Sequence, residues 1–323
     1  MEPDLLMIFS RLFQPIIFAN MICFFTMNCW CIQSLPAQTQ AGAISSVSSG
    51  KDGCDTLGNL LTQNNSGSFG TLLRWNSGRY SSGGPDLNAP LVTDRPDFTE
   101  ASSTVGRKVT QLEIGYTYTK NNGDVADEKS HSYPEVLIRH GILADWLELR
   151  FAWNYSDLEM GPVQTSGAED LYLGLKIALT PQDQFLPEMA IIPQMTVPSG
   201  DDALSSGETL PGLNWIYGWE LNDYLSTAGS TQFNRAVDGG AVHTEWAQSW
   251  TIATSLTEKI GGYAEWFGIF PDDALTAQTE HYFNGGFTYL VNNDLQWDIR
   301  AGVGLNDNSD DYFIGTGLSM RFR

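Results

Sequence analysis

From Arg107 to the C-terminus, apolar and polar residues alternate along segments of about ten residues, the length of a tilted transmembrane strand. In "QLEIGYTYT", Leu112, Ile114 and Tyr116 fall on one face of an extended chain, whereas Gln111 and Glu113 fall on the other. "LELRFAWNY", "DLYLGLKIAL" and "LQWDIRAGVGL" repeat the pattern. A period of two residues predicts β-strands, because successive side chains of a strand point to opposite faces.

Turn residues separate these segments and predict about twelve strands. The predicted strands span residues 108–120, 132–141, 145–157, 169–180, 187–198, 210–221, 223–234, 243–256, 259–270, 279–291, 294–305 and 311–323. Links after odd-numbered strands are long and polar, such as "NNGDVADEKSH", "LEMGPVQTSGAE" and "RAVDGGAVH", whereas most links after even-numbered strands are tight. This alternation is typical of an all-β fold, the antiparallel up-and-down transmembrane β-barrel with long outer loops and short periplasmic turns. We therefore predict that residues 108–323 form an outer-membrane β-barrel.

A soluble barrel or sandwich is the alternative fold, since its strands alternate as well. Strands of soluble proteins, however, have a length of about five or six residues. The apolar faces here are almost entirely Leu, Ile, Val and aromatic, as a lipid-facing surface requires. Aromatic residues also recur near the ends of the predicted strands, as in an interfacial girdle: Trp146, Tyr155, Trp219, Tyr224 and Trp246. These features favour the membrane barrel.

The N-terminal part of the chain has a different composition. Residues 12–50 carry no charge and include the apolar run "PIIFANMICFFTMNCWCI", followed by small residues. This pattern predicts a signal peptide over residues 1–43, cleaved after Ala37 or Ala43, and an uncleaved membrane anchor is the alternative. Residues 44–90 are rich in Ser, Gly and Asn without a helical or strand period, and we interpret them as a disordered linker.

Charge and cysteine usage exclude several classes of protein. The chain has 38 acidic residues against 17 Lys and Arg, a net charge of −21, which excludes nucleic acid as a partner because phosphate binding needs clustered cations. Three of the four cysteines, Cys23, Cys29 and Cys31, lie in the N-terminal apolar segment. No disulfide framework and no thiolate zinc site are therefore expected, and we predict neither a metal nor a cofactor.

A charged stretch precedes the first predicted strand. "TDRPDFTEASSTVGRKVTQLEIGYTYT", with the later "EVLIRHGILADWLELRFAWNY" and "YAEWFGIF", resembles a family of outer-membrane β-barrels named for a MetA pathway of phenol degradation. The resemblance covers about residues 91–323 and implies a transporter or channel of Gram-negative bacteria for small compounds, aromatic ones among them. It supplies no catalytic residues. We expect residues 91–107 to be a periplasmic segment at the entrance of the barrel, and its charged residues to form a plug or latch: Asp94, Arg95, Asp97 and Glu100.

Charged residues on the polar face of the predicted strands would line the lumen, where they would set selectivity by size and charge. The candidates for the lumen and its constriction are Glu113, Glu135, Arg139, Glu148, Arg150, Asp170, Lys176, Glu220, Asp298 and Arg300. The alternative is that these charges pair across strands and merely fill a narrow lumen.

The sequence therefore predicts a porin-like channel for passive passage of small solutes, aromatic or hydrophobic compounds among them. Its partners would be the lipid bilayer of the outer membrane, the barrel assembly machinery during insertion, and the solutes themselves. A lipid hydrolase is the first alternative, but it needs a serine activated by a histidine, and none of the four histidines has a suitable partner at a persuasive spacing. A structural or adhesive barrel without transport is the second alternative. We expect no enzyme and assign no catalytic residue.

Overall fold

The structure is a computed structural model that describes residues 70–73, 85–122 and 127–323. The chain divides into two units, Met1–Cys54 and Asp55–Arg323, and all described residues belong to the second. The predicted signal peptide and most of the predicted linker lie outside the described residues.

Thirteen strands make up one antiparallel sheet. They are β1 (Thr110–Asn122), β2 (Asp127–Gly141), β3 (Leu147–Met160), β4 (Val163–Ala168), β5 (Leu171–Thr180), β6 (Glu188–Val197), β7 (Leu210–Asn222), β8 (Leu225–Asp238), β9 (Ala241–Ser255), β10 (Ile260–Asp272), β11 (Glu280–Asn292), β12 (Leu295–Gly304) and β13 (Tyr312–Phe322). Among the described residues no helix is long and apolar enough to cross a membrane.

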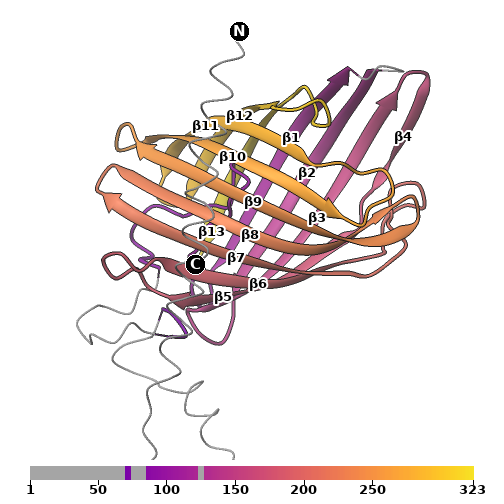
Figure 1. Ribbon diagram of the computed structural model, residues 1–323. Coiled ribbons are helices and arrows are strands. Elements are labelled where there is room, and N and C mark those ends of the chain that lie inside the picture. The colour runs from indigo at the N-terminus through magenta and orange to yellow at the C-terminus, as the bar shows by residue number, and fades with distance from the viewer. Residues whose placement is uncertain (1–69, 74–84, 123–126) are drawn as a thin grey trace, which may run out of the picture. The chain divides into compact units, whose positions relative to one another are not determined.

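The sheet closes into a barrel, because β1 pairs with β13 from Thr110↔Phe322 to Lys120↔Tyr312 and also pairs with β2. β4 and β5 both pair with β3, one after the other, and so share one position around the barrel. Thirteen strands with one shared position give a closed barrel of twelve. Figure 1 shows β1, β2 and β3 running side by side, with β4 at their outer tip. The prediction of an all-β, twelve-stranded antiparallel barrel is confirmed.

Three predicted long links lie largely in strands. In "NNGDVADEKSH", every residue that the structure describes belongs to β1 or β2. The stretch "RAVDGGAVH" is not a loop, because β8 and β9 continue through it to a turn at Gly239 and Gly240, both with positive φ. Positive φ at both central residues is typical of the type I′ turn, whose twist matches that of the two flanking strands in a two-residue hairpin. The stretch "LEMGPVQTSGAE" forms the end of β3 and the whole of β4. These last two stretches lack a continuous apolar face and therefore resemble loops in the sequence.

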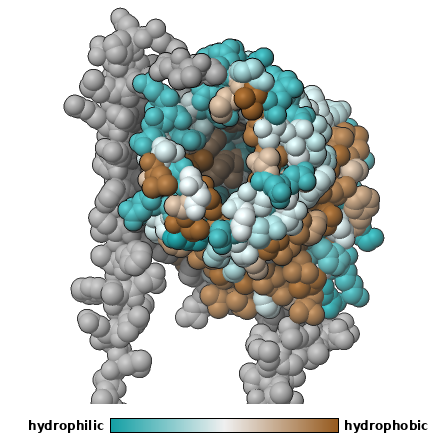
Figure 2. All heavy atoms as spheres, turned by 90° about the vertical axis from the view of Figure 1, so that its right-hand side faces the viewer, coloured by the Kyte–Doolittle hydropathy of each residue, from teal (hydrophilic) through white to brown (hydrophobic). Residues whose placement is uncertain are grey.

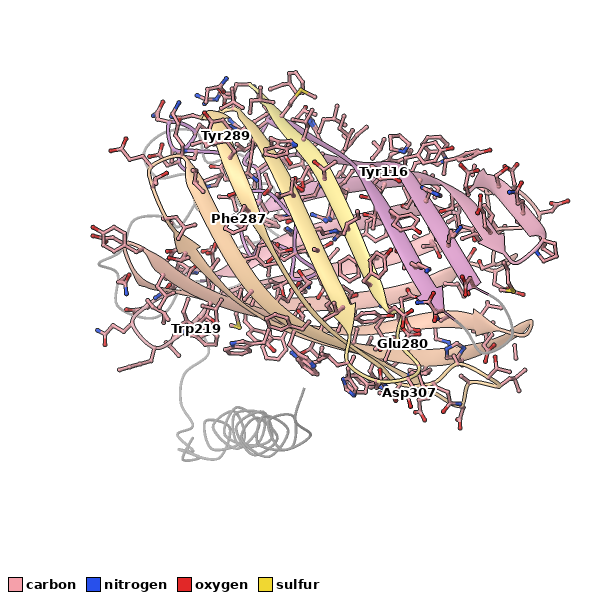
Figure 3. The ribbon with its side chains drawn as sticks, turned by 90° about the horizontal axis from the view of Figure 1, so that it is seen from above. Tyr116, Trp219, Glu280, Phe287, Tyr289 and Asp307 are labelled. Atoms are coloured by element: carbon pink, nitrogen blue, oxygen red, sulfur yellow. The ribbon has the colours of Figure 1, made fainter. Side chains whose placement is uncertain are left out.

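The two faces of the wall differ as the alternation predicts. Large apolar side chains on the outer face are exposed, among them Tyr116, Phe287 and Tyr289, which are labelled in Figure 3. Polar side chains on the inner face are buried, with Glu113, Arg139 and Glu148 each at most 1% exposed. Figure 2 shows hydrophobic residues over the outside of the barrel and hydrophilic residues at its rim.

The two ends of the barrel also differ. At one end, called here the short-turn end, the links are residues 142–146, 181–187, 223–224, 256–259 and 293–294. At the other, called the long-loop end, they include residues 198–209, 273–279 and 305–311.

Candidate functional site inside the barrel

Residues 85–107, called here the inner segment, enter the barrel at the short-turn end and return to it. On the way in, the amide N–H of Leu91 donates to the carbonyl of Asn293 at 2.9 Å. On the way out, the N–H of Lys108 donates to the carbonyl of Gly141 at 2.8 Å. Both partners lie at short-turn ends of the wall, and the indigo trace that precedes β1 lies on that side in Figure 1. Residues 92–104 therefore form a loop that projects into the lumen.

Asp94 lies in the centre of a cluster of cations from the wall. Its carboxylate is 3.3 Å from Nη1 of Arg139, 2.5 Å from Nη1 of Arg150 and 3.0 Å from Nζ of Lys176. Asp94 is 6% exposed, and the cations come from β2, β3 and β5. Burial by itself raises the pKa of Asp94, but the three positive charges outweigh it and hold that pKa well below its usual range.

Two wall carboxylates complete this cluster and also bind the backbone of the inner segment. Glu113 accepts hydrogen bonds from the N–H of Asp94 at 3.1 Å and from Nη1 of Arg139 at 3.2 Å. Glu148 accepts from Nε of Arg139 at 2.9 Å and from the N–H of Val105 at 2.8 Å. Buried polar groups need such partners, so the wall charges are arranged around a segment that lies between them.

Arg95 makes a second set of contacts on the adjacent part of the wall, from β2 to β12. Its guanidinium is 2.7 Å from Oε2 of Glu135 on β2, and its Nε is 3.4 Å from Oδ2 of Asp298 on β12. It lies directly over Gly115 and Gly317, where an added Cβ would come within 2.2 Å of the guanidinium. Glycine at these positions therefore leaves the space that Arg95 occupies.

The tip of the inner segment contacts β9 and β10. The N–H groups of Phe98 and Thr99 each donate to the carboxylate of Glu265 at 2.7 Å, and the hydroxyl of Thr99 is 2.6 Å from that of Ser249. The ring of Phe98 stacks on Phe267 with centroids 4.5 Å apart and planes 3° apart. The loop thus reaches from the cation cluster to the opposite side of the lumen.

Most of the candidate lumen residues contact the inner segment. Eight of them form hydrogen bonds with it: Glu113, Glu135, Arg139, Glu148, Arg150, Lys176, Asp298 and Arg300. Arg300 donates from Nη1 to the carbonyl of Pro96 at 3.0 Å.

Asp170 and Glu220 lie elsewhere. Asp170, between β4 and β5, accepts hydrogen bonds from the N–H groups of Ser199, Gly200 and Ser206 and so holds the loop 198–209. Although partial burial raises the pKa of Asp170, these bonds lower it to about 2. The side chain of Glu220 is exposed, and its backbone bonds to Gln182.

The candidate residues of the inner segment also divide. Asp94, Arg95 and Glu100 pair with the wall, with Glu100 at 2.8 Å from Nη2 of Arg150. Asp97 is half-buried and forms no salt bridge within the part of the chain that the structure describes. Burial, together with repulsion from Glu265, raises the pKa of Asp97 well above its usual value.

The sequence analysis missed the aromatic residues of the lumen. Phe267 stacks on Tyr282 with centroids 4.8 Å apart, and Phe313 lies 6.4 Å from Phe267. All three are at most 9% exposed. Phe267 falls two residues after Glu265, on the same face of β10, so an aromatic residue on the polar face was a readable signal.

The described residues contain no cluster of three or more His, Cys, Asp and Glu that could hold a metal ion. The histidine rings of the described part have no serine hydroxyl partner: His131 bonds to Tyr116, and His140 bonds to Thr110. The arrangement inside the barrel therefore offers charge pairing and stacking rather than a nucleophile with its base.

The sequence model of a family described as "Putative MetA-pathway of phenol degradation" matches residues 93–322. The chain belongs to this family. The match begins at Thr93, so it includes the buried loop as well as the barrel. No curated protein matches the sequence.

The fold is similar to solved outer-membrane proteins. An outer membrane channel from Pseudomonas putida F1 has a TM-score of 0.56 and 16% identity, covering 70% of this chain and 99% of that one. A KdgM porin in complex with oligogalacturonate has a TM-score of 0.44 and 11% identity, covering 66% and 99% of the two chains. The translocator domain of the autotransporter NalP from Neisseria meningitidis has a TM-score of 0.46 and 10% identity, covering 66% and 88%. The first of these supports the barrel fold.

Proposed function

We propose that the protein is an outer-membrane channel for passive passage of small solutes, aromatic or hydrophobic compounds among them, and that the inner segment is its plug. The family, the closed barrel and the apolar outer face support a place in the outer membrane of a Gram-negative cell. In such barrels the short turns face the periplasm, so the inner segment enters from that side. Export by the N-terminal signal peptide and insertion by the barrel assembly machinery belong to the same proposal.

The observation that carries the plug is the spread of its contacts around the wall. Asp94 bonds to β2, β3 and β5, Arg95 to β2 and β12, and Thr99 to β9 and β10. A loop held on several sides of a lumen at once leaves little free cross-section. Solutes therefore pass only when this loop moves, and the buried charge pairs define the closed state.

Two other functions have less support. A lipid hydrolase needs a serine activated by a histidine, and the described residues contain no such pair. A structural barrel without transport needs no segment that can leave the lumen. That function does not explain why charges and glycines of the wall fit the inner segment.

A cross-link between plug and wall tests the proposal. Thr99→Cys and Ser249→Cys replace two hydroxyls that are 2.6 Å apart, in a chain with Cys54 changed to Ser. We expect no conductance in planar bilayers when the disulfide is formed, and openings after reduction. The matched control is Ser230→Cys with Ser249→Cys, whose hydroxyls are 2.8 Å apart on neighbouring wall strands, because its disulfide leaves the plug free. Equal conductance of the oxidised and reduced plug variant would contradict the plug, and the absence of any conductance after reduction would contradict the channel.

A further inference from the structure

Beyond the tip of the plug, the long-loop end of the barrel has a hollow, called here the vestibule. Figure 2 views the barrel from the side on which β4 lies in Figure 1, and it shows this hollow inside a hydrophilic rim. One wall of the vestibule carries three carboxylates: Glu245 on β9, Glu280 on β11 and Asp310 in the loop 305–311. The strand register places Glu280 nearer the long-loop end than the plug tip. Glu280 pairs with Ile269 on β10, which lies two residues beyond Phe267, the residue on which Phe98 of the plug stacks.

Hydrogen bonds tie these acids to the aromatic residues around the plug tip. The hydroxyl of Tyr282 donates to Oε2 of Glu280 at 2.8 Å and accepts from the N–H of Asp310 at 3.1 Å. The ring of Tyr282 stacks on Phe267, which in turn stacks on Phe98 of the plug. Acids and aromatic rings therefore form one continuous surface, with Glu280 at its outer edge near Asp307 (Figure 3).

No Lys or Arg pairs with these carboxylates in the described part of the chain, and the group of opposite charge that acts on Glu245 is His243. None of Glu245, Glu280 and Asp310 forms a salt bridge with any described residue. Instead, the charge of Glu280 is repelled by Glu245, and burial together with repulsion from Glu280 raises the pKa of Asp310 to about 6. A half-buried acidic wall with no Lys or Arg as counter-charge is costly, and a bound cation would relieve that cost.

A buried histidine next to this wall points the same way. His243 is 4% exposed, and neither of its ring nitrogens has a hydrogen-bond partner in the described part of the chain. It lies two residues from Glu245 on the same face of β9, so the two side chains are neighbours. Buried polar atoms are usually paired, so these two ring nitrogens are an exception that a hydrogen-bonding group of a ligand would satisfy.

We propose that this wall is a binding site for an organic cation, with an ammonium group between Glu245 and Glu280 and an apolar body against the rings of Tyr282 and Phe98. Carboxylates attract the charge from solution, and aromatic faces bind a weakly hydrated cation better than a strongly hydrated metal ion. Arg300 already shows this preference within the protein, since its guanidinium lies 5.5 Å from the centroid of Phe313. The inference rests on the proposed function, because it names the solute class that the vestibule would collect.

The test is calorimetric binding of benzyltrimethylammonium to the full-length protein in detergent. We expect millimolar or tighter binding, with benzyl alcohol and benzoate at least about tenfold weaker, because the carboxylates favour only the cation. The double variant Glu245→Gln and Glu280→Gln should weaken binding of the cation by about tenfold or more. Asp307→Asn is the matched control, since Asp307 is an exposed acid in the loop that carries Asp310, and it should leave binding unchanged.

Three outcomes would overturn the site: equal binding of benzyl alcohol and the cation, unchanged binding by the double variant, or full displacement by millimolar calcium, which would make it an inorganic cation site. The measurement does not need an open pore. Binding without conductance would therefore refute the channel alone, and conductance without binding would refute this site alone.

Discussion

Two layers of the same lumen differ in how their charged side chains are paired. In the plug layer every cation among Arg139, Arg150 and Lys176 lies within 3.3 Å of Asp94, and the wall acids share the same cations. In the vestibule, Glu245 and Glu280 pair with no Lys or Arg among the described residues, and only His243 lies beside Glu245. Paired charges hold a segment in place, whereas unpaired charges remain available to a ligand.

This comparison also shows where stability resides. A buried ion pair adds little to stability by itself, because desolvation offsets the attraction, but removing one partner leaves a buried charge uncompensated. Asp94 pairs with all three of these cations, whereas Glu100, the other acid of the inner segment in this layer, pairs with Arg150 alone. The loss of Asp94 should therefore affect the plug layer far more than the loss of a vestibule acid.

The largest expected effect follows from Asp94→Asn. We expect the free energy that holds the plug in place to fall by about 3–5 kcal/mol, because three buried cations lose their shared anion. Hydrogen exchange of the N–H groups of Phe98 and Thr99, which donate to Glu265, would measure this loss. Asp86→Asn is the control, an exposed acid of the same segment, and should leave the exchange rates unchanged. Equal protection in both variants would show that the pairs in the plug layer do not hold the plug.

Much of the plug layer can be predicted from the sequence, whereas the vestibule cannot. A period of two residues is enough to place Glu113, Arg139 and Lys176 on one face of their strands, because that period follows from backbone geometry. The depth to which the inner segment enters depends on contacts between residues far apart in the chain, such as Phe98 with Phe267. Local patterns do not encode those contacts. Asp170 was misplaced for the same reason, since its partners come from a loop about thirty residues later.

A smaller effect is expected where glycine makes room for Arg95. In Gly115→Ala, the new Cβ would lie 2.2 Å from Nη1 of Arg95, and its three nearest atoms would all belong to that guanidinium, which must therefore move away from Glu135. We expect a cost of about 1–3 kcal/mol, typical of overpacking, and about a tenfold rise in the frequency of channel openings.

Single-channel recording would measure the Gly115→Ala effect. Gly262→Ala is its control, because the nearest atoms to the added Cβ there belong to Leu256 and Phe287 at 3.4 and 3.5 Å, which is ordinary contact. A similar opening frequency in both variants would mean that the fit between Arg95 and the wall does not hold the closed state.

Asp97 belongs to the plug but resembles the vestibule acids, so it gives the smallest and most specific test. Its pKa is raised in the closed state by burial and by Glu265, whereas in a released, solvated plug it would be near the usual ~3.9. Protons therefore bind the closed state more tightly, and lowering the pH from 7 toward 5 should stabilise it. Asp94 does not oppose this change, because its pKa is held low and its contribution is lost only below about pH 4.

We expect openings to become a few-fold rarer between pH 7 and pH 5, and Asp97→Asn to remove this dependence by giving the low-pH behaviour at both values. Conductance recorded at the two pH values, with Asp86→Asn as the control, would measure it. A pH profile unchanged by Asp97→Asn would assign the titration to other groups, such as Asp310 with its pKa of about 6. Since Asp310 lies in the vestibule wall, that result would move pH sensing from the plug layer, where charges are paired, to the layer where they are not.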